Sequence, residues 1–147
     1  MEFDEKLRSW AKGMYALEAA TELLIRASGG RFASPGYPWV LVEEGSPWIN
    51  FEAIADNVDG LSGGERRMML LIASLGGGEP VDLSDVLPAL DRTNLELVLA
   101  AVAHAGGSHQ HSGLVENPDG SHSIRVQEAL YPWPKPPNPL RSVPPVG

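Results

Sequence analysis

Leu61-Ser62-Gly63-Gly64-Glu65 opens the stretch that decides the fold, which continues as an apolar run and stops at three glycines, residues 76–78. Ser62 and Glu65 have the S-x-x-E spacing of a capping box, in which the serine oxygen accepts from the backbone of the glutamate and the glutamate reaches back to the serine. The residues after Arg67 are apolar on nearly every side. The stretch therefore predicts a helix over Glu65–Leu75 at the centre of the core, ended by glycine in the left-handed conformation.

The N-terminal segment carries apolar residues at helical spacing. They follow one another at intervals of 4-3-4-3-4-3, and only one is polar: Phe3, Leu7, Trp10, Met14, Leu17, Thr21 and Leu24. This repeat is typical of a helix whose seam packs on another helix. It predicts one long helix over Asp4–Ala27, ended by Ser28-Gly29-Gly30. The seam can be covered by the chain's own helices or by a second copy, and Leu7, Trp10, Met14 and Leu17 are candidate interaction residues.

A third helix is expected over Arg92–Ala105, with Asp91 as its N-cap and Gly106-Gly107 as its end. Its apolar positions lie on one helical face: Leu95, Val98, Leu99 and Val102. Asp82 or Ser84 is expected to open a short helix before it. Together these helices predict a helical core domain over residues 1–107.

Two segments favour strands. Tyr37–Val42 and Trp48–Phe51 flank a turn and predict a short hairpin near residues 37–51, although Asn50 could instead cap a brief helix. Residues 114–126, around the turn Asn117-Pro118-Asp119-Gly120, predict a hairpin-like extension over residues 108–130. The fold class expected is mainly α within α+β: a small helical domain with a long N-terminal helix, one or two β-hairpins and a proline-rich C-terminal arm.

The C-terminal tail, residues 131–147, holds seven of the 13 prolines and favours an extended conformation. Overlapping P-x-x-P spacings beside Trp133 make Trp133, Pro134 and Pro137 candidate contacts with a groove of another protein. The alternative is a tail that straps over its own domain, anchored by Trp133 and Leu140.

Charge and composition exclude several classes of function. The net charge of −8 repels a phosphate backbone, so nucleic acid is not an expected partner. The longest apolar run, Met68–Ala73, is too short to cross a bilayer, and no membrane association is expected. The absence of cysteine excludes disulfides and thiolate sites and favours a cytoplasmic protein.

Two motifs around the capped helix resemble a known family. The Leu61-Ser62-Gly63-Gly64-Glu65 loop, with Ala89-Leu90-Asp91 further on, is similar to the signature loop and a second loop of ATP-binding-cassette and chromosome-maintenance ATPases. The resemblance covers Leu61–Ala103 and implies that Ser62, Gly63 and Gly64 contact the phosphate of a nucleotide held by an opposing subunit. The chain departs from that family because it has no G-x-x-x-x-G-K-[ST] loop. The local alternative is that these residues only cap helices.

All four histidines lie within residues 104–122. His104, His109 and His111 with Glu116 offer the mixed nitrogen and oxygen ligands of a divalent transition metal such as zinc. A metal there would support hydrolysis by activating a bound water.

These patterns lead to one function and two alternatives. The function expected first is a non-enzymatic, acidic protein-protein interaction or accessory subunit without a cofactor, self-associating or bound to a protein partner. The alternatives are a metal-dependent hydrolase that uses the histidine cluster, and a nucleotide-dependent partner of an ATPase.

Overall fold

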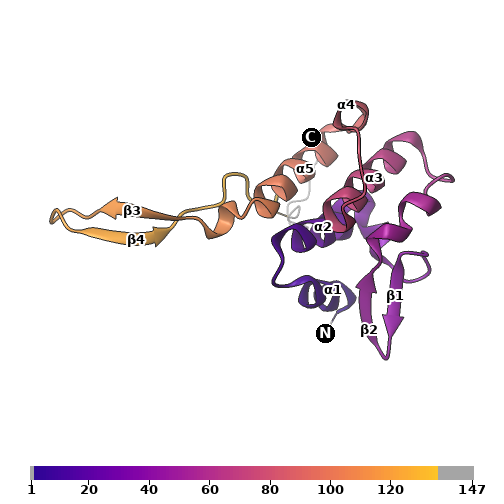
Figure 1. Cartoon of the computed structure of the whole chain (residues 1–147), viewed down its shortest axis with the longest axis horizontal. Coiled ribbons are helices and arrows are strands. Elements are labelled where there is room, and N and C mark those ends of the chain that lie inside the picture. Colours follow the sequence, from indigo (N-terminus) through magenta and orange to yellow (C-terminus); the bar gives the residue numbers. More distant parts are fainter. Residues whose placement is uncertain (1, 136–147) are drawn as a thin grey trace, which may run out of the picture.

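The computed structural model of the chain describes residues 2–135 and has a mixed α+β fold, shown in Figure 1. Within those residues it contains five α-helices, short 3₁₀ turns and two antiparallel hairpins. The expected helical α+β class is therefore confirmed. Pro137 and Leu140, on which part of the tail prediction rests, lie outside the described residues.

The core forms where three helices meet. α2 (Tyr15–Arg26) packs against both α3 (Gly63–Gly77) and α5 (Arg92–Ala105). Within α3, Met68, Met69 and Ile72 are each no more than 1% exposed. The predicted burial of this helix in the core is confirmed, while α2 is the helix that packs on both of the others.

The ends of α3 are formed as the sequence predicts. The backbone N–H of Glu65 donates to Ser62 Oγ at 3.3 Å, and Ser62 Oγ donates to Glu65 Oε1 at 3.0 Å. Gly78 follows the last turn with φ of 76°, a left-handed conformation that costs glycine little. The local capping chemistry thus fixes both ends of the helix at the core.

The single helix predicted over Asp4–Ala27 is wrong. The chain forms α1 (Phe3–Ala11), then a turn in which Gly13 has φ of +115°, then α2. The turn folds α1 back so that Arg8 contacts Glu22, whereas 14 residues of continuous helix would separate them by about 21 Å. The heptad spacing did not predict this break, because the apolar repeat continues across the turn.

The folding back also changes the predicted seam. Leu7 is wholly buried in the core of its own chain, and Leu17 packs against that core. Trp10 is half-exposed and stacks on Phe51, while Met14 is 67% exposed. The continuous seam on which helix pairing was predicted is therefore absent from the described residues.

The hairpin predicted near residues 37–51 is present, and the brief helix offered as its alternative occurs after it as 3₁₀ turns without a side-chain cap from Asn50. β1 (Val40–Glu43) pairs with β2 (Ser46–Ile49), and 3₁₀ turns follow over Phe51–Ala53 and Ala55–Asn57. Trp39 anchors the hairpin because its indole N–H donates to the Phe32 carbonyl at 2.8 Å inside the core.

The chain between α3 and the second hairpin is short and well capped. α4 (Leu83–Val86) begins at Asp82, whose carboxylate accepts from Ser84, and a 3₁₀ turn over Leu87–Ala89 follows. α5 begins at Asp91, which accepts from the Asn94 N–H at 2.7 Å. Both predicted caps are confirmed.

The second hairpin projects from the body. β3 (Ser112–Glu116) and β4 (His122–Val126) pair antiparallel beyond a 3₁₀ turn over Ser108–Gln110. Figure 1 shows this hairpin extending away from the helices at the end of α5. The extension predicted around the 117–120 turn is present as an isolated arm.

Candidate functional site

The root of the arm brings together an acid and two histidines. His104 in the last turn of α5 places Nε2 2.8 Å from Glu18 Oε1 in the first turns of α2. His109, in the 3₁₀ turn that follows α5, stacks on His104 with ring centroids 3.9 Å apart and planes 12° apart. One ligand atom from each of the three residues lies within 4.8 Å of the others.

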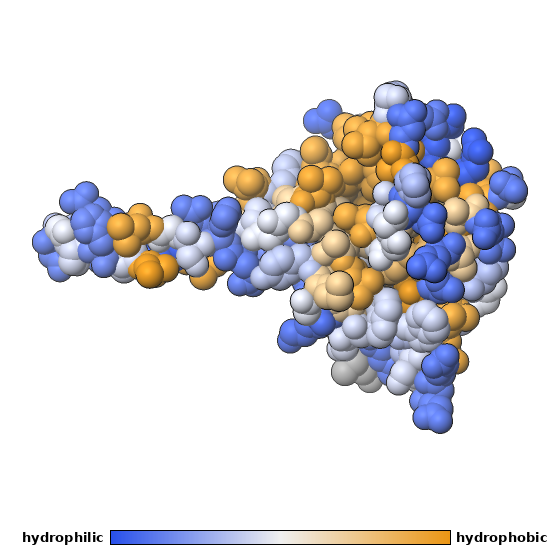
Figure 2. Space-filling model, in the orientation of Figure 1, coloured by the Kyte–Doolittle hydropathy of each residue, from blue (hydrophilic) through white to orange (hydrophobic). Residues whose placement is uncertain are grey.

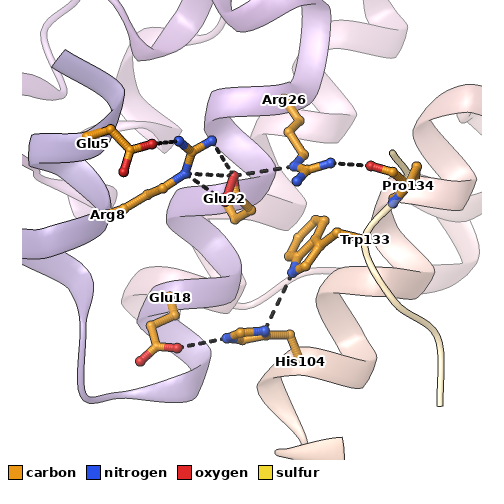
Figure 3. Close-up of polar contacts among 8 residues, drawn as sticks. All are labelled: Glu5, Arg8, Glu18, Glu22, Arg26, His104, Trp133 and Pro134. Atoms are coloured by element: carbon orange, nitrogen blue, oxygen red, sulfur yellow. Dashed lines mark hydrogen bonds and ion pairs between the residues drawn. The ribbon is translucent and has the colours of Figure 1, made fainter. Parts of the chain in front are cut away.

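Hydrogen bonds define the protonation pattern of His104. The indole N–H of Trp133 donates to Nδ1 at 3.5 Å, so Nδ1 carries no proton and Nε2 donates to Glu18. Figure 3 shows His104 between Glu18 and Trp133. The His104 ring is therefore held on both sides.

His109 is held by stacking alone. Its Nδ1 is buried and has no hydrogen-bond partner among the described residues. The edge of its ring meets Tyr15, with centroids 4.9 Å apart. Burial lowers the pKa of His109, and the neighbouring His104 lowers it further, while Glu18 acts in the opposite direction.

Glu18 stays ionised in this setting. Partial burial alone would raise its pKa, but hydrogen bonds from the Gly13 N–H and from His104 outweigh that effect and hold the pKa below its ordinary value. The cluster therefore combines one carboxylate with two imidazoles, a donor set that suits zinc and related ions.

A charged network borders the cluster. Glu22 accepts from Arg8 at 2.8 Å and from Arg26 at 3.3 Å, and Arg8 also pairs with Glu5 (Figure 3). The pairing with Glu22 holds the pKa of Arg8 above its ordinary range. Arg8 and Glu22 line a pocket of about 230 Å³ together with Ala11, Lys12, Glu18, His104 and Trp133.

The described part of the tail lies on its own domain. Arg26 donates to the Pro134 carbonyl at 2.6 Å, and its guanidinium lies 5.2 Å from the Trp133 ring. The Leu130 N–H donates to Ser108 Oγ. These contacts agree with the strap alternative for Trp133 and Pro134, and a role for either in binding a partner stays a prediction.

The structure regroups the predicted metal ligands. His104 and His109 come together as expected, but the third member is Glu18, and neither His111 nor Glu116 belongs to the group. His111 is exposed after the 3₁₀ turn, and Glu116 lies at the far end of β3. Sequence reasoning missed Glu18 because it lies 86 positions from His104, and only its place before a helical break distinguishes it.

The projecting hairpin carries a bare apolar face. In the observed register Leu114 pairs with Ile124, and Ser112 pairs with Val126 on the same face. Leu114, Ile124 and Val126 are 70%, 76% and 64% exposed. The opposite face, with Val115 and Ser123, is less exposed.

A second apolar surface lies over α4 and α5. Of the four apolar α5 residues predicted to share one helical face, only Val98 is buried, and Leu95, Leu99 and Val102 are exposed. A groove of about 310 Å³ between α3, α4 and α5 runs along it, lined by Leu71, Leu75, Leu83, Leu87, Val98 and Val102 among others. Figure 2 shows orange apolar residues gathered over this part of the body and along the hairpin.

The two loops that resemble ATPase motifs lie side by side. Ser62 and Gly64 border a pocket of about 480 Å³ together with Ala89 and Asp91. Ser62 and Asp91 each accept a backbone hydrogen bond at the start of their helices. Their cap role is thus present, while phosphate binding by Ser62, Gly63 and Gly64 stays a prediction.

Comparison with known proteins gives no family for this chain: no family model, no curated protein and no solved structure matches it. Within residues 2–135, no helix has the length and apolar character needed to cross a membrane.

Proposed function

We propose that the protein is a non-enzymatic interaction subunit that self-associates through the apolar face of the β3–β4 hairpin. The observation that carries this proposal is the exposure of Leu114, Ile124 and Val126 on a single face of that arm. The occupant of the face is the same hairpin of a second copy.

The stability of the arm supports a partner. A two-stranded hairpin alone in water is marginally stable at best, and it gains stability when an apolar face packs on another layer. The β1–β2 hairpin has such a layer, because Val40 and Ile49 are buried in the core and α1 packs on β2. The β3–β4 arm extends away from the helices (Figure 1), so a second copy would supply the missing layer.

Charge favours this surface over the α5 groove. Residues 79–105, which include α4 and α5, hold five acids with the single base Arg92 and one histidine. Residues 111–128 hold three acids with Arg125 and two histidines. Two acidic grooves would therefore repel each other more strongly than two arms.

A twofold arrangement makes the surface sensitive to single substitutions. In a twofold interface each residue occurs on both sides, so one substitution removes apolar contact twice. Threonine keeps the strand preference of the position and removes part of the apolar surface. Leu114→Thr and Ile124→Thr are therefore suitable test variants.

Sedimentation velocity of the full chain across a range of concentrations tests the proposal. The wild type should form a dimer, and Leu114→Thr and Ile124→Thr should each weaken it by about tenfold or more, which corresponds to about 1.4 kcal/mol. The matched control is Val42→Thr, at a strand position 50% exposed in the other hairpin, and it should leave the dimer unchanged. The dimer should also tighten between low and moderate salt, because screening reduces the repulsion between two chains of charge −8.

Three results would overturn the proposal. One is a wild type that stays monomeric at every concentration. Another is a dimer that all three threonine variants leave intact. The third is a dimer lost in Leu99→Gln but kept in Ile124→Thr, which would place the interface at the α5 groove.

A further inference from the structure

We propose that Glu18, His104 and His109 form a binding site for a divalent transition metal ion, with zinc as the best chemical match. The proposal is independent of self-association, because the three residues lie at the root of the arm and not on its apolar face. It also differs from the ligand set expected from the sequence, which included His111 and Glu116.

The positions of the ligand atoms favour a common ion. Zinc binds imidazole nitrogen and carboxylate oxygen at about 2.0–2.2 Å, so two ligands of one ion lie at most about 4.4 Å apart. The three ligand atoms here lie within 4.8 Å of one another. Rotation of the His109 side chain would close that difference, and a water molecule would complete the four positions of zinc.

His109 supplies a second, independent indication. Its Nδ1 is buried and lacks a hydrogen-bond partner among the described residues, which is costly for a polar atom. The rings of His104 and His109 are stacked nearly parallel, so their in-plane lone pairs do not converge on one point. Metal binding therefore requires His109 to rotate out of the stack, and the ion would give a buried nitrogen of this ring its missing partner.

His104 links the ion to the tail. Coordination through Nε2 replaces the proton that now faces Glu18, and the neutral ring then carries its proton on Nδ1. Nδ1 can no longer accept from the Trp133 indole, which now donates to it. Binding should therefore displace the Trp133 side chain and change its fluorescence.

The site joins three separate segments. Glu18 belongs to α2, His104 to α5, and His109 to the turn that leads into β3. The other carboxylate of the adjoining pocket, Glu22, is paired with Arg8 and Arg26, so it is not free to act as a general base. The arrangement favours an ion that fixes the root of the arm over one that activates a nucleophile.

Calorimetric titration of the tag-free, chelator-treated protein with Zn²⁺ tests the site. One ion should bind per chain. Loss of an outer-shell group already weakens metal sites by about 10- to 100-fold, so loss of a ligand in Glu18→Gln or His109→Ala should weaken binding at least as much. The matched controls are His111→Ala and His122→Ala, both at exposed positions near the site in sequence, and they should bind like the wild type.

Two spectroscopic readouts distinguish this site from other ligands and from misfolding. Co²⁺ in place of Zn²⁺ should give visible absorption bands that disappear in His109→Ala, while circular dichroism shows that the variant is folded. Metal-induced fluorescence change should shrink in Trp133→Phe without loss of binding. Absence of stoichiometric binding in the wild type, or loss of binding in His111→Ala with His109→Ala unaffected, would overturn the proposal.

Discussion

The Glu18 carboxylate contacts both His104, which lies 86 positions away in the sequence, and the turn between α1 and α2. Its Oε1 lies 2.8 Å from His104 Nε2, and its Oε2 accepts from the Gly13 N–H at 2.8 Å. One side chain thus holds the turn that folds α1 back and the end of α5 from which the arm extends. The same carboxylate that stabilises the fold is the ligand proposed for the metal ion.

Thr21 is a stability defect in the core. It is 1% exposed, and its Oγ1 has no hydrogen-bond partner among the described residues. Thr21→Val keeps the side-chain shape and removes the unsatisfied hydroxyl, so it should raise the free energy of unfolding by about 1 kcal/mol. Urea denaturation measures the change. Thr21→Ser, which keeps the hydroxyl and loses a methyl group, should instead destabilise, and a destabilising Thr21→Val would show that the hydroxyl is satisfied in solution.

Gly76 permits close approach between α3 and Phe51. A Cβ atom at Gly76 would lie 2.6 Å from carbons of the buried Phe51 ring, so Gly76→Ala should destabilise despite the better helix propensity of alanine, by about 1–3 kcal/mol. In the same helix, a Cβ at Gly64 would meet only the Ala89 carbonyl, at 3.8 Å. Gly64→Ala should therefore be neutral or stabilising. Thermal unfolding compares the two, and equal effects would contradict the close approach.

Glu22 joins α1, α2 and, through Arg26, the tail. Its side chain is 17% exposed and pairs with Arg8 and Arg26, so Glu22→Gln should lower the free energy of unfolding by about 1 kcal/mol at low salt. The loss should diminish in 1 M NaCl, where the charges are screened. Glu5→Gln removes only the exposed partner of Arg8 and should have little effect. A Glu22→Gln loss that does not depend on salt would indicate packing as its cause.

Variants of Ser62 distinguish its role as a helix N-cap from the hypothesis that it binds phosphate. Ser62→Ala should destabilise by roughly 1 kcal/mol because the Glu65 N–H loses its acceptor. Ser62→Asp should destabilise less than Ser62→Ala, since aspartate is a good N-cap although it loses the hydroxyl that donates to Glu65, while its charge would repel a phosphate. Denaturation and nucleotide-binding measurements on both variants test this. Strong nucleotide binding by the wild type that Ser62→Asp abolishes would favour the ATPase resemblance.

The sequence predictions were correct for features that depend on neighbouring residues and failed for features that depend on how distant segments pack. The caps at Ser62, Asp82 and Asp91 and both hairpins were predicted correctly, because a cap or a turn depends on residues within a few positions of it. The break at Gly13 was missed because an apolar 4-3 repeat fits two helices that pack together as well as one. The apolar face predicted on α5 is largely exposed, and the sequence could not show this because apolar periodicity marks a face without specifying what covers it.

The sequence by itself determined the N-caps of α3 and α5, which segments pair as hairpins, and that His104 and His109 lie close together along the chain. Only the tertiary structure brought Glu18 to His104, left His111 and Glu116 apart from them, and exposed the hairpin face that carries Leu114 and Ile124. The physical reason is that capping and turn formation are local. The meeting of side chains 86 positions apart depends instead on how the helices pack together.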